Sequence, residues 1–316
     1  VLGLGRVVWW TEAPWIGLAL VGAIVLLTLA VIVEHNRRTP LINTRWLAGA
    51  DLLRLLGAIL LLRIVLSEQT SGAVGFLQVL GLGTDQLHGL FAVILAAMVA
   101  GTLVSAFTLN LAKLNKPIAL ALALIAAGAL IDSHSSALTR PANLYFSQAL
   151  IGFASAMFIG PAMMIGITKV LQEGKQHFIS FIVMFSLLQN VGGLAGSALT
   201  GTVQVIREKF HSNQLAEGVA LTDPQVVQRV QQLSGAYAHT LTDPALRNAE
   251  GVALLSRQVT QQANVLAYND VFLMISALAA LGCLWVTINH LRPRWKARRA
   301  ARNDEAAQAA AVAAAD

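Results

Sequence analysis

The sequence predicts an all-α, polytopic helical membrane protein with about seven transmembrane helices, and three observations support this fold class. Hydrophobic residues make up 56% of the 316-residue chain and charged residues only 12%, which is about half the charged share of a soluble domain. The apolar residues form long continuous runs without polar alternation, which excludes a transmembrane barrel. Lys and Arg gather in every second connection between the runs.

A helix needs about 20 residues to cross about 30 Å of hydrocarbon. Runs of suitable length and composition predict seven spans, at 15–33, 49–66, 88–110, 117–131, 144–168, 178–206 and 268–290. The fourth run is short, and Lys116 beside it is expected to extend its ammonium group back to the lipid headgroups. The single cysteine, Cys283, lies in the last run, so no disulfide within the chain is possible.

The orientation follows from the positive charges of the short connections, because Lys and Arg are retained on the cytoplasmic side. The connections after the first, third and fifth runs and the segment after the seventh hold the cationic clusters: Arg37, Arg38, Arg45, Lys113, Lys116, Lys169, Lys175, Arg292, Arg294, Lys296, Arg298, Arg299 and Arg302. This pattern predicts an outside N-terminus, with Trp9, Trp10 and Trp15 at the outer interface, and a cytoplasmic C-terminus. It explains most of the net charge of +6 without nucleic acid as a partner. An outside N-terminus without a signal peptide predicts that an odd number of spans precedes residue 1 and that the chain is a fragment.

One long polar insertion, at 207–267, separates the sixth run from the seventh. The tetrapeptide Leu-Thr-Asp-Pro occurs in it twice, at 221–224 and 241–244. Asp before Pro is typical of a helix start, so we expect helices at about 224–238 and 244–262. A duplicated functional unit is the alternative. The predicted organisation is a bundle of about six spans at 1–206, an external helical loop at 207–267, the last span at 268–291 and a basic, Ala-rich cytoplasmic tail at 292–316.

Several segments resemble the late spans of the major facilitator superfamily, and in particular the fourteen-span EmrB/QacA-type drug:proton antiporters. They are Trp10, Glu34 to Leu41, Arg140-Pro141, Gln148 to Phe153, Gly160-Pro161, Leu187 to Gly193 with Gly196, and Gln262 to Phe272. The order of these segments and the long loop before the last run match spans eight to fourteen of that architecture. The resemblance therefore implies the C-terminal half of a major facilitator fold.

The resemblance also implies a function, which is proton-coupled efflux of hydrophobic or amphipathic compounds from the bacterial inner membrane. A proton gradient then drives transport and no cofactor is expected. The implied partners are the lipid bilayer, small hydrophobic substrates, the missing N-terminal half and, in Gram-negative members, a periplasmic adaptor and an outer-membrane channel. The resemblance places most of the acidic residues for proton coupling in the upstream half.

Charged residues inside the second run are candidates for coupling. Asp51 and Arg54 are three positions apart, so they share a helix face and can pair. This pair is either a neutralising contact near the inner interface or part of a gate. Arg63 lies nine positions beyond Arg54 and on the opposite face, where it is expected to reach the outer surface or to contact another helix.

The fifth and sixth runs supply the candidates for the substrate pathway. Gln189 and Asn190 lie near the middle of the sixth run and either contact substrate or form hydrogen bonds between helices. The other pathway candidates are Gln148, Met163 and Met164, although such Met residues often only fill packing gaps. Small residues that allow close helix packing or a hinge at the proline are Gly152, Gly160, Pro161, Gly192, Gly193 and Gly196.

Asp270, at the outer mouth of the last run, either complements the dipole of a first helical turn or takes part in coupling. No spacing of metal ligands, nucleophile motif or phosphate-binding loop occurs, so neither a metal site nor an enzyme is expected. Two other functions stay open. They are a complete seven-span receptor or sensor that binds a ligand with its outer loop, and an importer of the same fold.

Overall fold

A computed structural model describes the chain except for residues 1–13, 38–39, 41, 110–113, 220–221 and 314–316, and gives only the backbone for 115 and 290–313. Part of the predicted orientation rests on residues outside this description. They are Trp9, Trp10, Arg38, Lys113 and the basic side chains of the tail. Within the described residues there is no β-strand.

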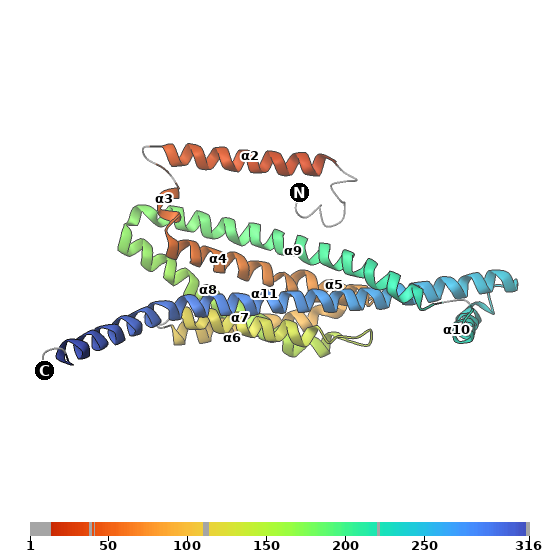
Figure 1. Ribbon diagram of the computed structural model, residues 1–316. Coiled ribbons are helices and arrows are strands. Elements are labelled where there is room, and N and C mark those ends of the chain that lie inside the picture. The colour runs from red at the N-terminus through yellow and green to blue at the C-terminus, as the bar shows by residue number, and fades with distance from the viewer. Residues whose placement is uncertain (1–13, 38–39, 41, 110–113, 220–221, 314–316) are drawn as a thin grey trace.

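The helices follow one another along the chain with short connections (Figure 1). Their bounds are α2 Pro14–Asn36, α3 Thr44–Leu47, α4 Ala50–Val65, the π-helix η1 Glu68–Ala73, α5 Val74–Val79, α6 His88–Thr108, α7 Asn115–Asp132, α8 Tyr145–Glu173, α9 Phe178–Glu217, α10 Pro224–Ser234 and α11 Pro244–Ala313. Short 3₁₀ turns precede three of the long helices, at Thr84–Leu87, Pro141–Leu144 and Lys175–His177, and another, Gly235–Tyr237, follows α10.

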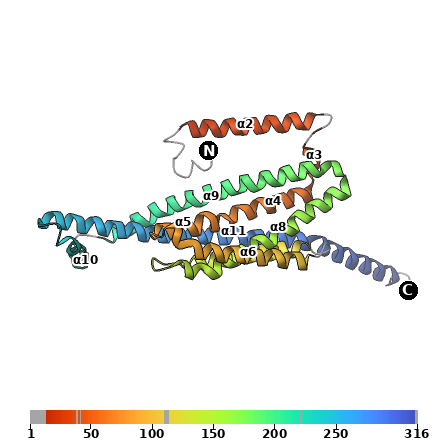
Figure 2. The same cartoon turned by 180° about the vertical axis from the view of Figure 1, so that it is seen from behind.

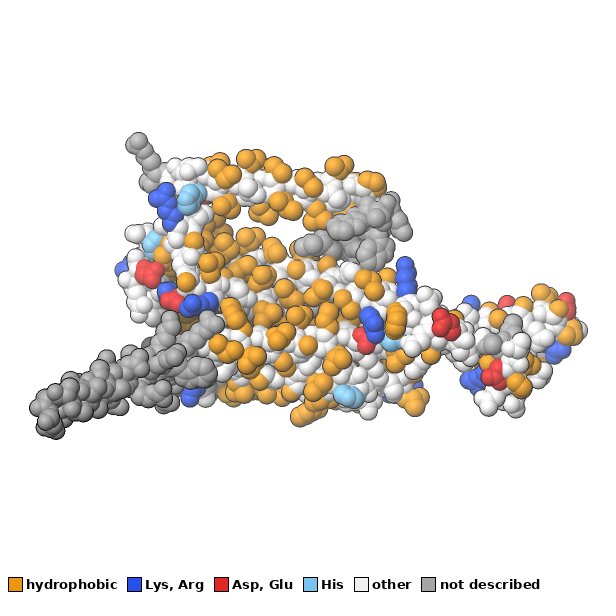
Figure 3. Space-filling view, viewed as in Figure 1, with side chains coloured by type: hydrophobic (Ala, Val, Ile, Leu, Met, Phe, Trp, Pro, Cys, Tyr) orange, Lys and Arg blue, Asp and Glu red, His pale blue; other side chains and the backbone are white. Residues whose placement is uncertain are grey.

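Within the described residues, five helices are long and apolar enough to cross a membrane, namely α2, α6, α8, α9 and α11. The predicted spans at 49–66 and 117–131 correspond to α4 and α7, which are not among these five. Figure 3 shows apolar side chains covering the middle of the molecule, whereas charged side chains gather towards its two ends. Large apolar side chains are exposed, among them Leu18, Leu95 and Phe107. These features fit a helical membrane protein.

The long helices run side by side along one axis, which defines two ends (Figures 1 and 2). We call the end that carries α3 and the turn between α8 and α9 the tail end, and the opposite end the α10 end. Within the bundle α6 packs on α8, α7 on α8 and α11, and α9 on α4 and α11. Helix α2 stands apart from the bundle in both views, and Ile16 is its only buried residue in the described part.

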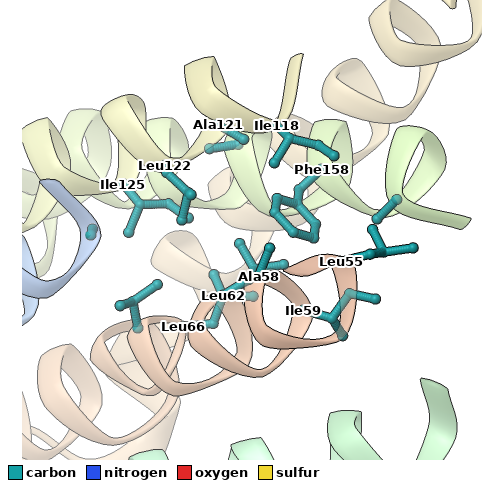
Figure 4. Close-up of a cluster of buried hydrophobic side chains, with 14 of the residues drawn as sticks. Leu55, Ala58, Ile59, Leu62, Leu66, Ile118, Ala121, Leu122, Ile125 and Phe158 are labelled. Carbon is teal, nitrogen blue, oxygen red and sulfur yellow. The ribbon is translucent and has the colours of Figure 1, made fainter. Parts of the chain in front are cut away.

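Apolar side chains of α4, α7 and α8 interlock in the centre of the bundle (Figure 4). The labelled members are Leu55, Ala58, Ile59 and Leu62 from α4, Leu66 directly after α4, Ile118, Ala121, Leu122 and Ile125 from α7, and Phe158 from α8. Helices α6 and α8 pack backbone to backbone, because Gly101 of α6 lies against the backbone of Phe153 of α8. This packing holds α4, α7 and α8 in fixed relative positions.

The second predicted span does not end at 66, and this correction changes the site. The helix continues from α4 through the wide turn η1 and through α5 to Val79. The hydroxyl of Ser67 donates to the Ile64 carbonyl at 2.6 Å and lies 2.9 Å from the Thr200 hydroxyl of α9. The predicted connection at 67–87 is therefore largely helical, and Glu68 lies in the interior of the bundle.

Both copies of the Leu-Thr-Asp-Pro repeat cap helices, which confirms that interpretation of the motif. The Asp223 carboxylate accepts from the Gln225 amide at 2.8 Å at the start of α10, and Asp243 accepts from Ala245 at 2.8 Å at the start of α11. Helix α11 then continues without interruption from Pro244 through the predicted last span.

Candidate functional site

Two carboxyl groups from different helices are enclosed in the bundle. Glu68 belongs to η1 and is 0% exposed, and Asp132, the last residue of α7, is 1% exposed. Neither forms an ion pair with a Lys, Arg or His among the described residues. Buried carboxylates are costly unless they are paired, hydrogen-bonded or protonated, so their other contacts decide what the site can do.

One amide group joins the two carboxyl groups. The Nε2 of Gln148 donates to Glu68 Oε1 at 2.9 Å and Oε2 at 3.2 Å, and to Asp132 Oδ2 at 2.7 Å. The hydroxyl of Ser147 donates to the other oxygen of Asp132. Ser147 and Gln148 are both 0% exposed. We call Glu68, Asp132, Ser147 and Gln148 the carboxyl cluster.

Local structure explains how the cluster is assembled. The 3₁₀ turn Pro141–Leu144 leads directly into α8, so Ser147 and Gln148 lie in the first turn of that helix, beside the end of α7. The wide turn η1 brings Glu68 beside Gln148, and Gln69 Nε2 donates to the backbone carbonyl of Gln148 at 3.1 Å. Three helices therefore fix the positions of the two carboxyl groups.

The carbonyl oxygen of the Gln148 side chain is buried and accepts no hydrogen bond from the described residues. An amide can present its N–H groups to ionised carboxylates or, after a half-turn, its oxygen to a protonated carboxyl group. The side chain of Gln148 is therefore chemically suited to both protonation states. This cluster can bind and release a proton. No three His, Cys, Asp or Glu side chains in the described part lie close enough together to hold a metal ion.

A second group of residues lies where α4 meets α9. Arg63 Nε donates to the backbone carbonyl of Gln189 at 3.0 Å, so Arg63 contacts another helix, as one of the two sequence interpretations predicted. Gly192 and Gly193 lie directly against the Arg63 side chain. The side chain of Asn190 is exposed and donates to the Ser186 carbonyl at 3.0 Å. The structure thus brings Arg63 together with one predicted pathway residue of the sixth run, Gln189, whereas Asn190 bonds within its own helix.

At the tail end, the predicted pair between Asp51 and Arg54 is present at 3.1 Å and is part of a larger network. Lys169 of α8 lies 3.4 Å from Asp51 and 3.5 Å from Glu173. The network borders a cavity of about 320 Å³ between α4, α7, α8 and α11. These side chains lie far along α4 from the carboxyl cluster, because Glu68 follows Asp51 by 17 residues, or about 25 Å of helix.

Asp270 does not lie in a first helical turn, so the dipole interpretation is wrong. Helix α11 begins at Pro244, which puts Asp270 well inside it. Its carboxylate instead bonds Arg207 Nε at 2.5 Å and His211 Nε2 at 2.7 Å, and both partners belong to α9. The guanidinium of Arg207 also stacks on Phe210, 4.7 Å from the ring centre. Asp270 therefore ties α9 to α11 near the α10 end.

We expect Asp270→Asn to lower the stability of the folded protein by about 1 kcal/mol, because the partly exposed carboxylate serves two partners on α9. The measurement is the thermal unfolding midpoint in detergent. Glu250→Gln is the matched control, since it removes one acidic group from the same helix α11 without breaking an ion pair within the described residues. Equal shifts of the unfolding midpoint in the two variants would contradict a stabilising contact between α9 and α11 through Asp270.

The other predicted residues are dispersed along α8 and α9. Met163 and Met164 are half-buried, and Met163 packs against the central core. Helix α8 is continuous across Pro161. A methyl group at Gly160 would lie 2.8 Å from Ser105 Oγ of α6, and one at Gly152 would lie 3.2 Å from the Ile94 carbonyl. A methyl group at Gly196 would lie 2.7 Å from the Ile64 carbonyl of α4.

Sequence reasoning did not single out Glu68, Asp132 or Ser147. Both acidic residues stand at the edge of an apolar run, so a search for uninterrupted runs assigned them to connections. A signal was nevertheless present. Glu68 and Asp132 follow the predicted outer ends of spans two and four, and Gln148 lies near the predicted outer start of span five. Their common level in the membrane could have indicated that the three side chains are close in space. No model of a known protein family matches the chain, and no curated protein matches its sequence.

Proposed function

We propose that this chain is the C-terminal half of a proton-coupled secondary transporter with a major facilitator fold, which exports hydrophobic or amphipathic compounds in exchange for protons. The observation that carries the proposal is the carboxyl cluster, in which two buried carboxyl groups share one amide donor. Ionisable residues enclosed in membrane helices commonly form proton relays. Gln148 also lies in one of the segments that resemble the EmrB/QacA-type antiporters.

In this proposal, the charge of the carboxyl cluster determines how the helices around it pack. With both carboxyl groups ionised, two negative charges are enclosed without a cation among the described residues, which favours a conformation that opens the cluster to water. A bound proton removes one of these charges and favours the enclosed conformation. Glu68 and Gln148 belong to different helices, so a change at their contact also changes how the α4–α5 run and α8 pack.

The two bundles of the complete transporter would then rock about a site near the middle of the membrane. In this chain, α8 and α9 would provide one wall of the pathway, with Gln189 and Asn190 on α9. The missing half would provide the opposite wall. The proposed orientation in the bacterial inner membrane places the α10 end outside and the tail end in the cytoplasm, where a periplasmic adaptor could contact the loop at 207–267.

Coupled flux in vesicles tests this proposal. The full-length protein is reconstituted in vesicles with an acidic interior, and the amphipathic dyes ethidium and pyrenebutyrate are added outside. We expect at least one dye to be taken up in a saturable manner and to release protons from the lumen, as a pH-sensitive fluorophore would report. Dye uptake that persists after an ionophore has collapsed the gradient would indicate a uniporter. Binding without uptake would indicate the receptor alternative.

A further inference from the structure

A polar cavity adjoins the carboxyl cluster at the α10 end of the molecule. The connection between α7 and α8, at residues 133–140, turns at this end in both views (Figures 1 and 2). Together with the adjoining helix ends it borders a cavity of about 350 Å³, and Asp132 is one of the lining residues. Glu68, Ser147 and Gln148 do not line it. Asp132 is therefore the member of the cluster that borders this cavity, which we call the Asp132 cavity.

Burial distinguishes the floor of the Asp132 cavity from its rim. Asp132 and Thr139 are 1% and 8% exposed, so they belong to the floor. His134, Ser136 and Asn143 are exposed and belong to the rim. The cavity thus leads from a surface in contact with solvent to the buried residue Asp132. In the proposed orientation, that surface lies on the outside of the membrane.

The lining of the Asp132 cavity suits water and a hydrated proton. Its volume is several times that of one water molecule, about 30 Å³, and hydroxyl, imidazole and amide groups supply hydrogen-bond partners. His134 Nδ1 donates to the Leu130 carbonyl at 2.9 Å, which leaves Nε2 to accept from water. Asp132 and His134 are the ionisable residues of the lining, and no Lys or Arg of the described residues belongs to it. A positive charge that enters the cavity is therefore attracted to Asp132.

A proton on Asp132 is one transfer away from Glu68. Both carboxyl groups accept from Gln148 Nε2, at 2.7 Å for Asp132 and 2.9 Å for Glu68. They are also near enough to hydrogen-bond to each other when one of them is protonated. The groups that face Asp132 from the neighbouring helices are Ser147 and Gln148 of α8 and Glu68 of η1, and none of them is a cation. Asp132 therefore connects the cavity with the enclosed Glu68.

We propose that the Asp132 cavity is the external proton entrance of the transporter, with Asp132 as the first acceptor and Glu68 as the second. This inference rests on the proposed proton coupling, and it adds the side and the order of proton entry. Hydronium in the cavity transfers a proton to the Asp132 carboxylate and becomes water. The Asp132 carboxyl group then transfers that proton to the Glu68 carboxylate and is ionised again. The amide of Gln148 donates to whichever carboxylate is ionised.

Blocking the cavity tests the inference without a proton gradient or a substrate. Ser136→Cys is introduced into the full-length protein after Cys283 and any upstream cysteine have been replaced by Ser, and the new thiol on the rim is modified with a benzophenone methanethiosulfonate. Infrared spectroscopy in D₂O at acidic pH gives the rate of H/D exchange of the carboxyl C=O band before and after modification. We expect the modification to slow exchange at least about tenfold, because the cluster then reaches solvent only by local opening of the bundle.

Thr240→Cys in the same background, modified with the same reagent, is the matched control. Thr240 is exposed in the polar insertion and does not line the cavity, so its modification should leave the exchange rate unchanged. An unchanged rate after modification of Ser136→Cys would overturn the inference. Equal slowing in the two modified proteins would also overturn it, because the effect would then not come from the cavity.

Two substitutions test the order of the carboxyl groups. Glu68→Gln leaves Asp132 as the carboxyl group of the cluster, and Asp132→Asn leaves Glu68. We expect the remaining band to exchange at least about tenfold more slowly in Asp132→Asn than in Glu68→Gln, since the enclosed Glu68 then has no acceptor beside the cavity. The thermal unfolding midpoint of each variant shows whether its bundle is folded. Equal rates, or faster exchange in Asp132→Asn, would overturn the proposed order.

Failure of this inference is distinguishable from failure of the proposed function. Exchange that ignores the blocked cavity, together with proton-coupled flux in the vesicle assay, would show that protons enter elsewhere and would overturn only the inference. Slower exchange after blocking, without coupled flux, would support proton access through the cavity and refute proton-coupled transport. The absence of any exchangeable carboxyl band at acidic pH would overturn both.

Discussion

Replacing Glu68 by Gln should reduce proton-coupled flux to the level of protein-free vesicles while the bundle stays folded. The substitution keeps the shape of the side chain but removes its ability to bind and release a proton. Glu68 is fully enclosed and both of its oxygens accept from Gln148, which also donates to Asp132, so the cluster keeps only one carboxyl group when Glu68 is replaced. The measurement is proton release from acid-loaded vesicles on addition of substrate, with equal amounts of reconstituted protein.

Thermal stability separates loss of function from loss of fold in this experiment. We expect the unfolding midpoint of Glu68→Gln to equal or exceed that of the wild-type protein, because the substitution removes a buried ionisable group. Glu217→Gln is the matched control, since Glu217 is exposed at the end of α9 and should leave flux unchanged. Asp132→Asn should also abolish flux, and the double variant should be no worse than either single one, because the two residues act as a unit. Normal coupled flux in Glu68→Gln would show that the cluster does not carry the proton.

The largest effect on stability is expected for Gly101→Val. A methyl group at this position of α6 would lie 2.3 Å from the carbonyl oxygen and 3.0 Å from the carbonyl carbon of Phe153, and backbone atoms of α8 cannot rotate away. The two helices would have to separate. Overpacking of this kind costs about 1–3 kcal/mol or more, so we expect the unfolding midpoint to fall by about 5 °C or more.

Gly22→Val is the matched control for this prediction. Gly22 also lies in an apolar helix, α2, but a methyl group added to it meets nothing within 4 Å. Its unfolding midpoint should stay within about 1 °C of the wild-type value, because no packed contact changes. If the two variants lost stability equally, the effect would reflect valine in a helix and not the contact between α6 and α8.

The positions of the helices were largely predictable because their signals are local. The signals are a long apolar run, a connection that holds Lys or Arg, and an Asp-Pro pair at a helix start. Each of them can be read from neighbouring residues alone. They predicted the positions of α6 and α8 and the starts of α10 and α11. The end of the second predicted span was wrong for a related reason. Glu68 interrupts the apolar run, but its burial comes from contacts with α7 and α8, which are distant in the sequence.

The candidate sites depended on such distant contacts and were predicted less well. The pair between Asp51 and Arg54 was predictable because it is three residues apart on one helix. Gln148 was named, but without its carboxyl partners, 80 and 16 residues away. Arg63 was expected either to reach the outer surface or to contact another helix, and the residue that it contacts, Gln189, is 126 residues away. Asp270 was assigned to a helix start because the last span was predicted to begin at 268, apart from the helix predicted at 244–262, whereas both belong to the single helix α11.

Infrared difference spectroscopy of the carboxyl C=O stretch tests the central claim most directly. Spectra of the reconstituted protein are recorded at acidic and alkaline pH for the wild-type protein, Glu68→Gln and Asp132→Asn. A protonated carboxyl group in the cluster should give a pH-dependent band that is present in the wild-type protein and absent or shifted in both variants. A difference spectrum that is the same in all three proteins would contradict proton binding by Glu68 and Asp132.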